Sequence, residues 1–139
     1  MNPTQVAMQA ATQAFSFDSP DILSELERCS DEELDALDFG VIGIDAETHV
    51  RRYNAFESEA AALSSARVLG HPLFTVVAPC MNNFMIAQRF EDALAAGTVL
   101  DTTLDYVLTL RMRPVKVKLR LVGAPGARHR YVLVLRRTA

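Results

Sequence analysis

Hydrophobic and polar residues alternate along two stretches near the end of the chain, residues 104–112 and 115–121. A period of two is typical of β-strands that bury one face and expose the other. In the second stretch the polar positions are lysine and arginine, so the pattern predicts a solvated, basic face. A third strand is predicted over residues 131–135, after a turn that contains proline and glycine.

Two further strands are predicted earlier in the chain. Residues 39–44 are apolar apart from glycine, residues 45–48 are typical of a turn, and residues 50–53 form the returning strand of a hairpin. Residues 54–66 are mostly alanine, glutamate, leucine and serine. This composition predicts a helix directly after the hairpin.

A longer helix is predicted over residues 83–96, since apolar side chains recur there at helical spacing and Gly97 suits its C-terminal end. Pro72 and Pro79 interrupt the segment before it, because the residue preceding a proline is disfavoured in a helix. The positions expected on the buried face of the longer helix are Phe84, Ala87, Phe90 and Leu94.

Two short helices are predicted before the first strand. Ser19 is placed to cap the first, with Pro20 at its first helical position, and a capping box at Ser30 opens the second. We therefore expect an N-terminal arm and helical cap over residues 1–38 and a single domain over residues 39–139.

The order of these elements is that of an α+β domain, with helices between the second and third strands of an antiparallel sheet. It resembles the PAS fold, a five-stranded antiparallel sheet with helices on one face, here preceded by the helical cap. A pocket lies between sheet and helices in that fold, but the fold alone does not identify a ligand. The length of 139 residues suits one domain.

No apolar run is long enough to span a bilayer, and the first residues lack the basic start and apolar core of a secretion signal. We therefore expect a cytoplasmic protein with no membrane partner. The chain is predicted to be a monomer or a weak dimer.

Charge is distributed unevenly, although the net charge is only −3. Nine acidic residues and one basic residue lie between Asp18 and Asp38, whereas nine basic residues and no acidic residue follow from Arg111 onward. Such a basic segment can bind nucleic acid, but these cations lack the interleaved aromatic residues of a base-stacking surface. We interpret the two segments as neighbours that offset each other, and expect no nucleic-acid partner.

Cysteine and histidine give little indication of a disulfide or a metal site. Cys29 and Cys80 are not expected to pair in a cytoplasmic protein. The three histidines are scattered, without a second ligand at metal-binding spacing, so no metal is predicted.

Three side chains are candidates for chemistry. Cys80 follows a proline where a short segment meets the next predicted helix, a place that can expose backbone N–H groups and favour a thiolate. Tyr53 and Glu57 are four residues apart at a strand-to-helix transition, so they can converge. The plainer alternatives are a small core cysteine, a tyrosine that anchors packing and a solvated glutamate.

Four segments are distinctive: Tyr53-Asn54-Ala55-Phe56-Glu57 and Val77-Ala78-Pro79-Cys80, together with residues 31–40 and 112–118. They resemble the photoactive yellow protein family of blue-light receptors. The resemblance implies a p-coumaric acid (4-hydroxycinnamic acid) chromophore, a small molecule bound covalently to Cys80 as a thioester. Tyr53 and Glu57 would then hydrogen-bond the phenolic oxygen of the chromophore.

The resemblance also implies a signalling mechanism. Light would isomerise the cinnamoyl double bond, Glu57 would pass a proton to the chromophore, and a buried carboxylate without compensation would remain. Relieving that charge is worth several kcal/mol, comparable with the stability of a small domain, so partial opening would follow. The signal would reach an unknown downstream signalling protein.

Three positions depart from the family pattern. Ala61 and Leu63 stand where family members commonly have a threonine that supports the tyrosine and an arginine that gates the pocket, and Leu108 stands near an expected aromatic residue. The positive charge of the missing arginine would then have to come from another residue, and Arg51, Arg52 and Arg67 are the candidates.

Two other functions are consistent with the sequence. The chain can be a PAS interaction module or small-molecule sensor without a covalent chromophore. It can also be an enzyme with Cys80 as nucleophile, but His71 is the only base nearby in sequence and no oxyanion-stabilising motif accompanies it. A non-enzymatic receptor is therefore expected.

Overall fold

The computed structural model of the protein describes residues 16–109 and 113–136. Its strands are β1 (Gly40–Ile44), β2 (Val50–Tyr53), β3 (Leu100–Leu108), β4 (Val115–Gly123) and β5 (Arg130–Arg136). Its α-helices are α2 (Ile22–Arg28), α3 (Asp31–Asp35), α4 (Ala55–Ala61), α5 (Ser65–Val68) and α6 (Ala87–Ala96). A π-helical turn, η1 (Leu73–Val77), and a 3-10 turn, η2 (Pro79–Met81), lie between α5 and α6.

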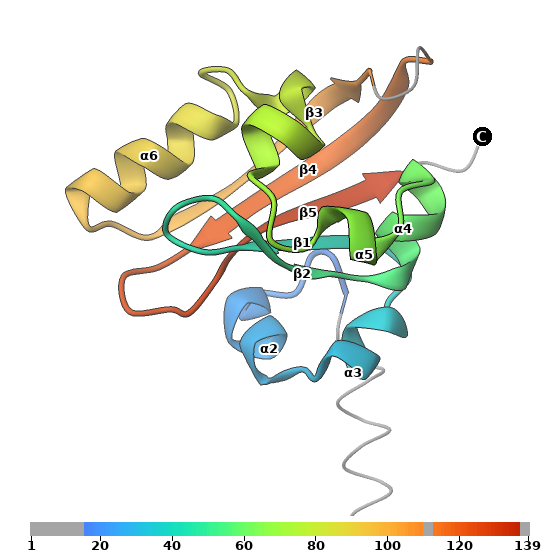
Figure 1. Ribbon diagram of the computed structural model, residues 1–139. Helices are drawn as coiled ribbons and strands as arrows, with labels where there is room; N and C mark the ends of the chain where they lie inside the picture. The colour runs from blue at the N-terminus through green and yellow to red at the C-terminus, as the bar shows by residue number, and fades with distance from the viewer. Residues whose placement is uncertain (1–15, 110–112, 137–139) are drawn as a thin grey trace, which may run out of the picture.

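The five strands form one antiparallel sheet in the order β2-β1-β5-β4-β3. Helices α4, α5 and α6 lie over one face of this sheet, and the cap helices α2 and α3 lie on the other side (Figure 1). This is the α+β PAS fold, and both the hairpin of β1 and β2 and the three C-terminal strands confirm the sequence prediction.

The sheet is buried on both faces in its centre. Val132 and Val134 of β5 pack into the core beneath α6, whereas the alternate residues Tyr131 and Leu133 pack against the cap. The prediction of a solvated basic face is therefore wrong where the cap covers the sheet. Arg120 is only 6% exposed there, because its guanidinium donates to the carbonyls of Phe17 and Ser19 and pairs with Asp101.

The helix predicted over residues 54–66 is two helices. Helix α4 ends at Ala61 because Ala62 adopts the left-handed conformation, with φ of 54°. The Ser58 hydroxyl donates to the carbonyl of Leu63 at 2.8 Å and stabilises this turn. Helix α5 then starts in a new direction, at Ser65.

The longer helix begins four residues later than predicted. The side-chain oxygen of Asn83 accepts hydrogen bonds from the N–H groups of Met85 and Ile86, which holds these residues in a turn before α6. Phe84 lies in this turn and is 79% exposed, and Leu94 is 46% exposed, so their predicted places on the buried face are wrong, whereas Ala87 and Phe90 are buried as predicted. Gly97 ends the helix with φ of 64°, as predicted.

Two further boundaries differ from the prediction. Strand β3 starts at Leu100 and ends at Leu108, so the expected positions Leu110 and Met112 lie outside the described residues. Ser19 does not cap α2, since its hydroxyl accepts from the N–H of Ser16 instead. The capping box at Ser30 is confirmed. The division of the chain at residue 38 stays a prediction.

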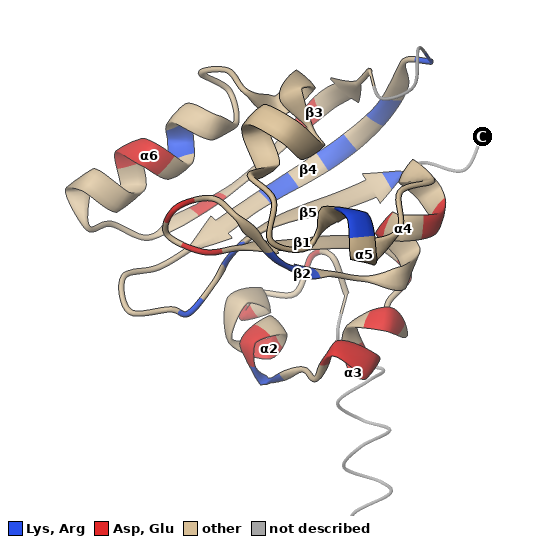
Figure 2. Ribbon diagram, viewed as in Figure 1, with Lys and Arg blue, Asp and Glu red and all other residues tan. Residues whose placement is uncertain are grey.

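The cap is attached to the sheet by buried polar contacts. Arg52 of β2 donates to the carbonyls of Leu26 and Cys29 at 2.8 and 2.6 Å and to the hydroxyl of Tyr131 at 2.9 Å. The Tyr131 hydroxyl in turn donates to the Glu27 carboxylate at 2.8 Å. Figure 2 shows acidic residues concentrated on α2 and α3 and basic residues along β4.

Replacement of Glu27 by glutamine is expected to weaken the cap in a pH-dependent way. Burial opposes ionisation of Glu27, but hydrogen bonds from His129 and Tyr131 outweigh it and hold the pKa of the carboxyl below its ordinary value. A depressed pKa stabilises the folded state above the ordinary value of 4.5, and this contribution is lost as pH falls through the folded pKa.

Urea unfolding of Glu27→Gln should therefore show lower stability than the parent at neutral pH and a smaller difference below pH 4.5. Glu32→Gln, at an exposed position of α3, is the control and should follow the parent. A constant difference between Glu27→Gln and the parent across this pH range would contradict the prediction.

Candidate functional site

Asn54 fixes the junction between β2 and α4 that carries two of the candidate residues. Its side-chain oxygen accepts from the N–H groups of Val41 and Glu57 at 2.9 and 3.1 Å, and its amide donates to two carbonyls of the preceding segment. Tyr53 and Glu57 are thereby held on one side of the sheet. Asn54 was given no role from the sequence, although asparagine at a helix start is a common N-cap.

Glu57 is buried and ion-paired. It is 1% exposed, and its two carboxylate oxygens accept from the guanidinium of Arg136 at 2.6 and 3.0 Å. The carboxylate lies directly over Gly40, where any side chain would overlap its Oε1. The alternative of a solvated glutamate is therefore wrong.

The contact of Arg136 with Glu57 was not predicted from the sequence, although the period of the strand indicates which face Arg136 occupies. It follows Val132 and Val134 at a spacing of two, so it reaches the same face of β5. The expected sources of a counter-charge are wrong, since Arg51 pairs with Asp45 and Arg52 binds the cap. The third expected source, Arg67, is exposed.

Tyr53 brings an unpaired hydroxyl into the same region. The residue is 9% exposed, and no hydrogen bond joins its hydroxyl to any residue that the structure describes. Burial raises the pKa of this phenol, the Glu57 carboxylate raises it further, and Arg136 opposes the change. The hydroxyl therefore stays protonated and is available as a hydrogen-bond donor.

Cys80 approaches this region from the opposite side of the core. It is partly buried in η2 and packs against the apolar cluster that contains Tyr53. Its carbonyl accepts from the Tyr106 hydroxyl at 2.5 Å, and Asn83 donates to that hydroxyl at 2.6 Å. The expected place at a helix start is wrong, because α6 begins seven residues further on.

Comparisons with known proteins identify the family, although no family model matches the chain. The chain is 37% identical over 108 residues to the photoactive yellow protein of Halochromatium salexigens and 32% identical to that of Rhodothalassium salexigens. Each alignment covers 78% of this chain and 86% of the relative. The chain belongs to the photoactive yellow protein family.

A solved structure agrees with this membership. The photoactive yellow protein domain of the sensor histidine kinase Ppr from Rhodospirillum centenum superposes with a TM-score of 0.76 at 33% identity, covering 83% of this chain and all of that domain. The PAS domain of the Cronobacter turicensis receptor RpfR, at 14% identity and a TM-score of 0.56, shares the fold only.

The three positions that depart from the family pattern are all apolar parts of the core. Ala61 and Leu108 are buried, and Leu63 packs against the same cluster as Cys80 and Tyr53. Neither Ala61 nor Leu63 can offer a side-chain hydrogen bond or a charge to the phenol end of the site. The polar side chains of Tyr53, Glu57 and Arg136 lie at this end of the core.

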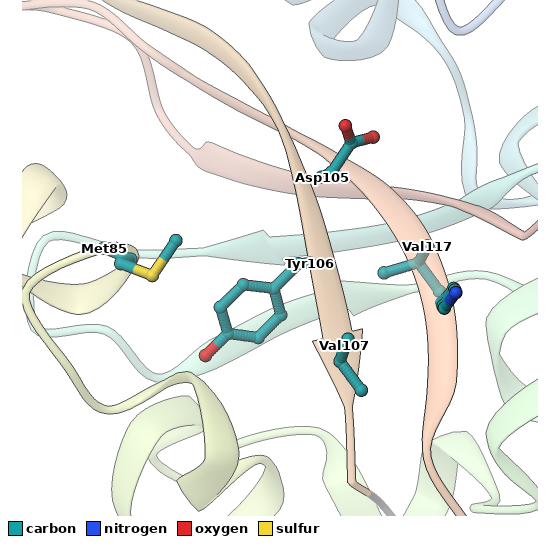
Figure 3. Close-up of a pocket in the computed structure, with 6 residues that line it drawn as sticks. Met85, Asp105, Tyr106, Val107 and Val117 are labelled. Carbon is teal, nitrogen blue, oxygen red and sulfur yellow. The ribbon is translucent and has the colours of Figure 1, made fainter.

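A groove adjoins the segment that carries Cys80. It has a volume of about 660 Å³ and is lined by residues of β3 and β4 together with Met85. Figure 3 shows the Tyr106 ring extending from β3 toward Met85. Since the Tyr106 hydroxyl contacts the Cys80 carbonyl, the groove lies next to the predicted attachment site.

Three further observations on the described residues concern metal binding, the enzyme alternative and membranes. No cluster of three or more histidine, cysteine, aspartate or glutamate side chains that could hold a metal occurs among them. His71, the base considered for an enzyme, is exposed. Within the same residues, no helix is sufficiently long and apolar to cross a bilayer.

Proposed function

We propose that this protein is a blue-light photoreceptor that binds p-coumaric acid covalently through Cys80. The observation that carries the proposal is that Cys80 and Tyr53 belong to one apolar core on one face of the sheet, with Glu57 beside Tyr53. The bound 4-hydroxycinnamoyl group would supply a light-absorbing phenolate and a double bond that isomerises.

Cys80 is the attachment residue in this proposal. Its thiolate attacks the carbonyl carbon of an activated p-coumaric acid, the activating group leaves, and a thioester to the cysteine sulfur forms. Tyr106 and Asn83 fix the backbone on which Cys80 lies, so the sulfur is presented from a defined position. Because the chromophore is attached once and the reaction is not repeated, no base is needed to regenerate the Cys80 thiolate.

Tyr53 and Glu57 hold the phenolic end. The Tyr53 hydroxyl fits a phenolate oxygen, because no described residue occupies it and a hydrogen bond to a charged acceptor is stronger than one to a neutral acceptor. Glu57 is the second donor in the dark, when it is protonated. After light absorption Glu57 passes this proton to the phenolate oxygen.

The signal is a partial opening of the fold. Arg52, which clamps the cap, directly precedes Tyr53 on the edge strand β2, so a shift of β2 changes both the site and the cap. Release of the cap would expose a surface to a downstream signalling protein. Cytoplasmic location and a monomeric or weakly dimeric state remain part of this proposal.

Reconstitution tests the proposed function. Apoprotein mixed with the anhydride or a thioester of p-coumaric acid is expected to turn yellow, to gain the mass of one acyl group, and to bleach and recover under blue light. A complete lack of acylation would favour a non-covalent PAS sensor instead. Steady turnover of the thioester would indicate an enzyme.

A further inference from the structure

We propose that Arg136 is a positioning residue of the light cycle, and that the Glu57–Arg136 pair is the arrangement reached after Glu57 has lost its proton. The inference rests on the proposed function. The expectation of an uncompensated carboxylate is thereby replaced, because Arg136 pairs with Glu57 once the proton has left.

The geometry is that of an ionised carboxylate. Both oxygens of Glu57 accept from the two terminal nitrogens of Arg136, at 2.6 and 3.0 Å. A protonated carboxyl carries hydrogen on one of its two oxygens, so this bidentate pair is typical of the ionised form. The Glu57 and Arg136 side chains are 2% and 16% exposed. A carboxylate this deeply buried is costly unless a cation accompanies it.

Other nearby cations are either already engaged or exposed. Arg51 pairs with Asp45 at 2.8 Å, and Arg52 donates to carbonyls of the cap on the opposite face. Arg67 on α5 and Arg113, which lines the same cavity as Arg136, are exposed. Among the residues that the structure describes, Arg136 is therefore the cation in contact with Glu57.

Arg136 also has room to leave Glu57. A cavity of about 210 Å³ lies beside it, lined by Ala60, Ala61 and Ala62, whose methyl groups take little space, and by Arg113. When Glu57 is protonated in the dark, the guanidinium can withdraw toward this cavity and water. A partly exposed arginine tolerates this change at a lower cost than a fully buried one.

The proton and the negative charge are both accounted for in this scheme. The O–H bond of Glu57 breaks, a new O–H bond forms at the phenolate oxygen, and the negative charge moves from the chromophore to Glu57. Arg136 then closes on Glu57 and forms the bidentate pair. Arg136 thus stabilises the light-activated state, and its removal should shorten the life of that state.

The apoprotein tests the pair without any chromophore. Arg136→Gln is expected to lower the folding equilibrium constant roughly tenfold to a hundredfold, because Glu57 is left as a buried unpaired charge. Glu57→Gln added to Arg136→Gln should recover most of this loss, since no charge then needs compensation. Urea unfolding of the parent, both single variants and the double variant measures the coupling.

The reconstituted protein tests the role in the light cycle. Recovery of the yellow absorption after a blue flash is expected to be about tenfold faster or more in Arg136→Gln than in the parent. Arg67→Gln, an exposed arginine on the same face, is the matched control and should recover at the parent rate. Infrared difference spectra should still show loss of the protonated carboxyl band of Glu57 in both variants.

The outcomes separate this inference from the proposed function. If the parent is not acylated, the proposed function fails and the inference fails with it. If the parent turns yellow and cycles, but Arg136→Gln recovers at the parent rate or the apoprotein variants show no coupling, the inference alone is wrong. Coupling in the apoprotein together with faster recovery in Arg136→Gln supports it.

Discussion

Cys80→Ser is expected to abolish formation of the yellow protein. The proposed bond joins the acyl group to sulfur, and a serine hydroxyl at a pKa far above neutral pH is a poor nucleophile without an adjacent base. The parent should gain one acyl mass with activated p-coumaric acid, whereas Cys80→Ser should gain none under the same conditions. Mass spectrometry of the intact protein and the visible spectrum measure both effects.

Cys29→Ser provides a matched control, since Cys29 is the second cysteine and is also partly buried. It packs against the cluster beneath the cap, on the other face of the sheet from Tyr53, and burial raises the pKa of its thiol. Cys29→Ser should therefore turn yellow like the parent. Equal labelling of Cys80→Ser, or loss of labelling in Cys29→Ser, would disprove the assignment.

Arg52→Ala is expected to release the N-terminal cap and to destabilise the protein by about 2–4 kcal/mol. The guanidinium of Arg52 satisfies the carbonyls of Leu26 and Cys29 and the hydroxyl of Tyr131, all close to the buried interface with the sheet. Its contact with Asp31 adds little, because that carboxylate is largely exposed. In Arg52→Ala these three polar groups would lose their hydrogen-bond donor and would have to be hydrated instead.

Urea unfolding and hydrogen exchange of the α2 amides measure this change. Arg51→Ala is the neighbouring control, because Arg51 is exposed and pairs with Asp45 at the hairpin turn. It should stay within about 0.5 kcal/mol of the parent. Equal protection of α2 in Arg52→Ala and in the parent would mean that the apolar contacts of the cap suffice without the arginine.

Features that depend on neighbours in the sequence were predicted correctly. The hairpin of β1 and β2, the capping box at Ser30 and the end of α6 at Gly97 each depend on residues within a few positions of one another. The short segments around Tyr53 and Cys80 likewise indicated the photoactive yellow protein family by their residues alone, and the curated relatives confirm it.

Features that depend on distant contacts were not predictable in this way. A period of two shows which residues share a face, but it does not show that α2 and α3 cover the outer face and bury Arg120. Similarly, the composition of residues 54–66 favours a helix throughout, and only the contact between Ser58 and Leu63 reveals the break at Ala62.

The sequence by itself determined the class of fold, the family and the two candidate ends of the site at Cys80 and at Tyr53 and Glu57. Only the tertiary structure decided which cation accompanies Glu57. Arg136 lies 79 residues away along the chain, and antiparallel pairing of β5 with β1 brings it beside α4. Local residue preferences extend over a few positions, whereas the charge balance of a buried site is set by whichever strands the sheet makes neighbours.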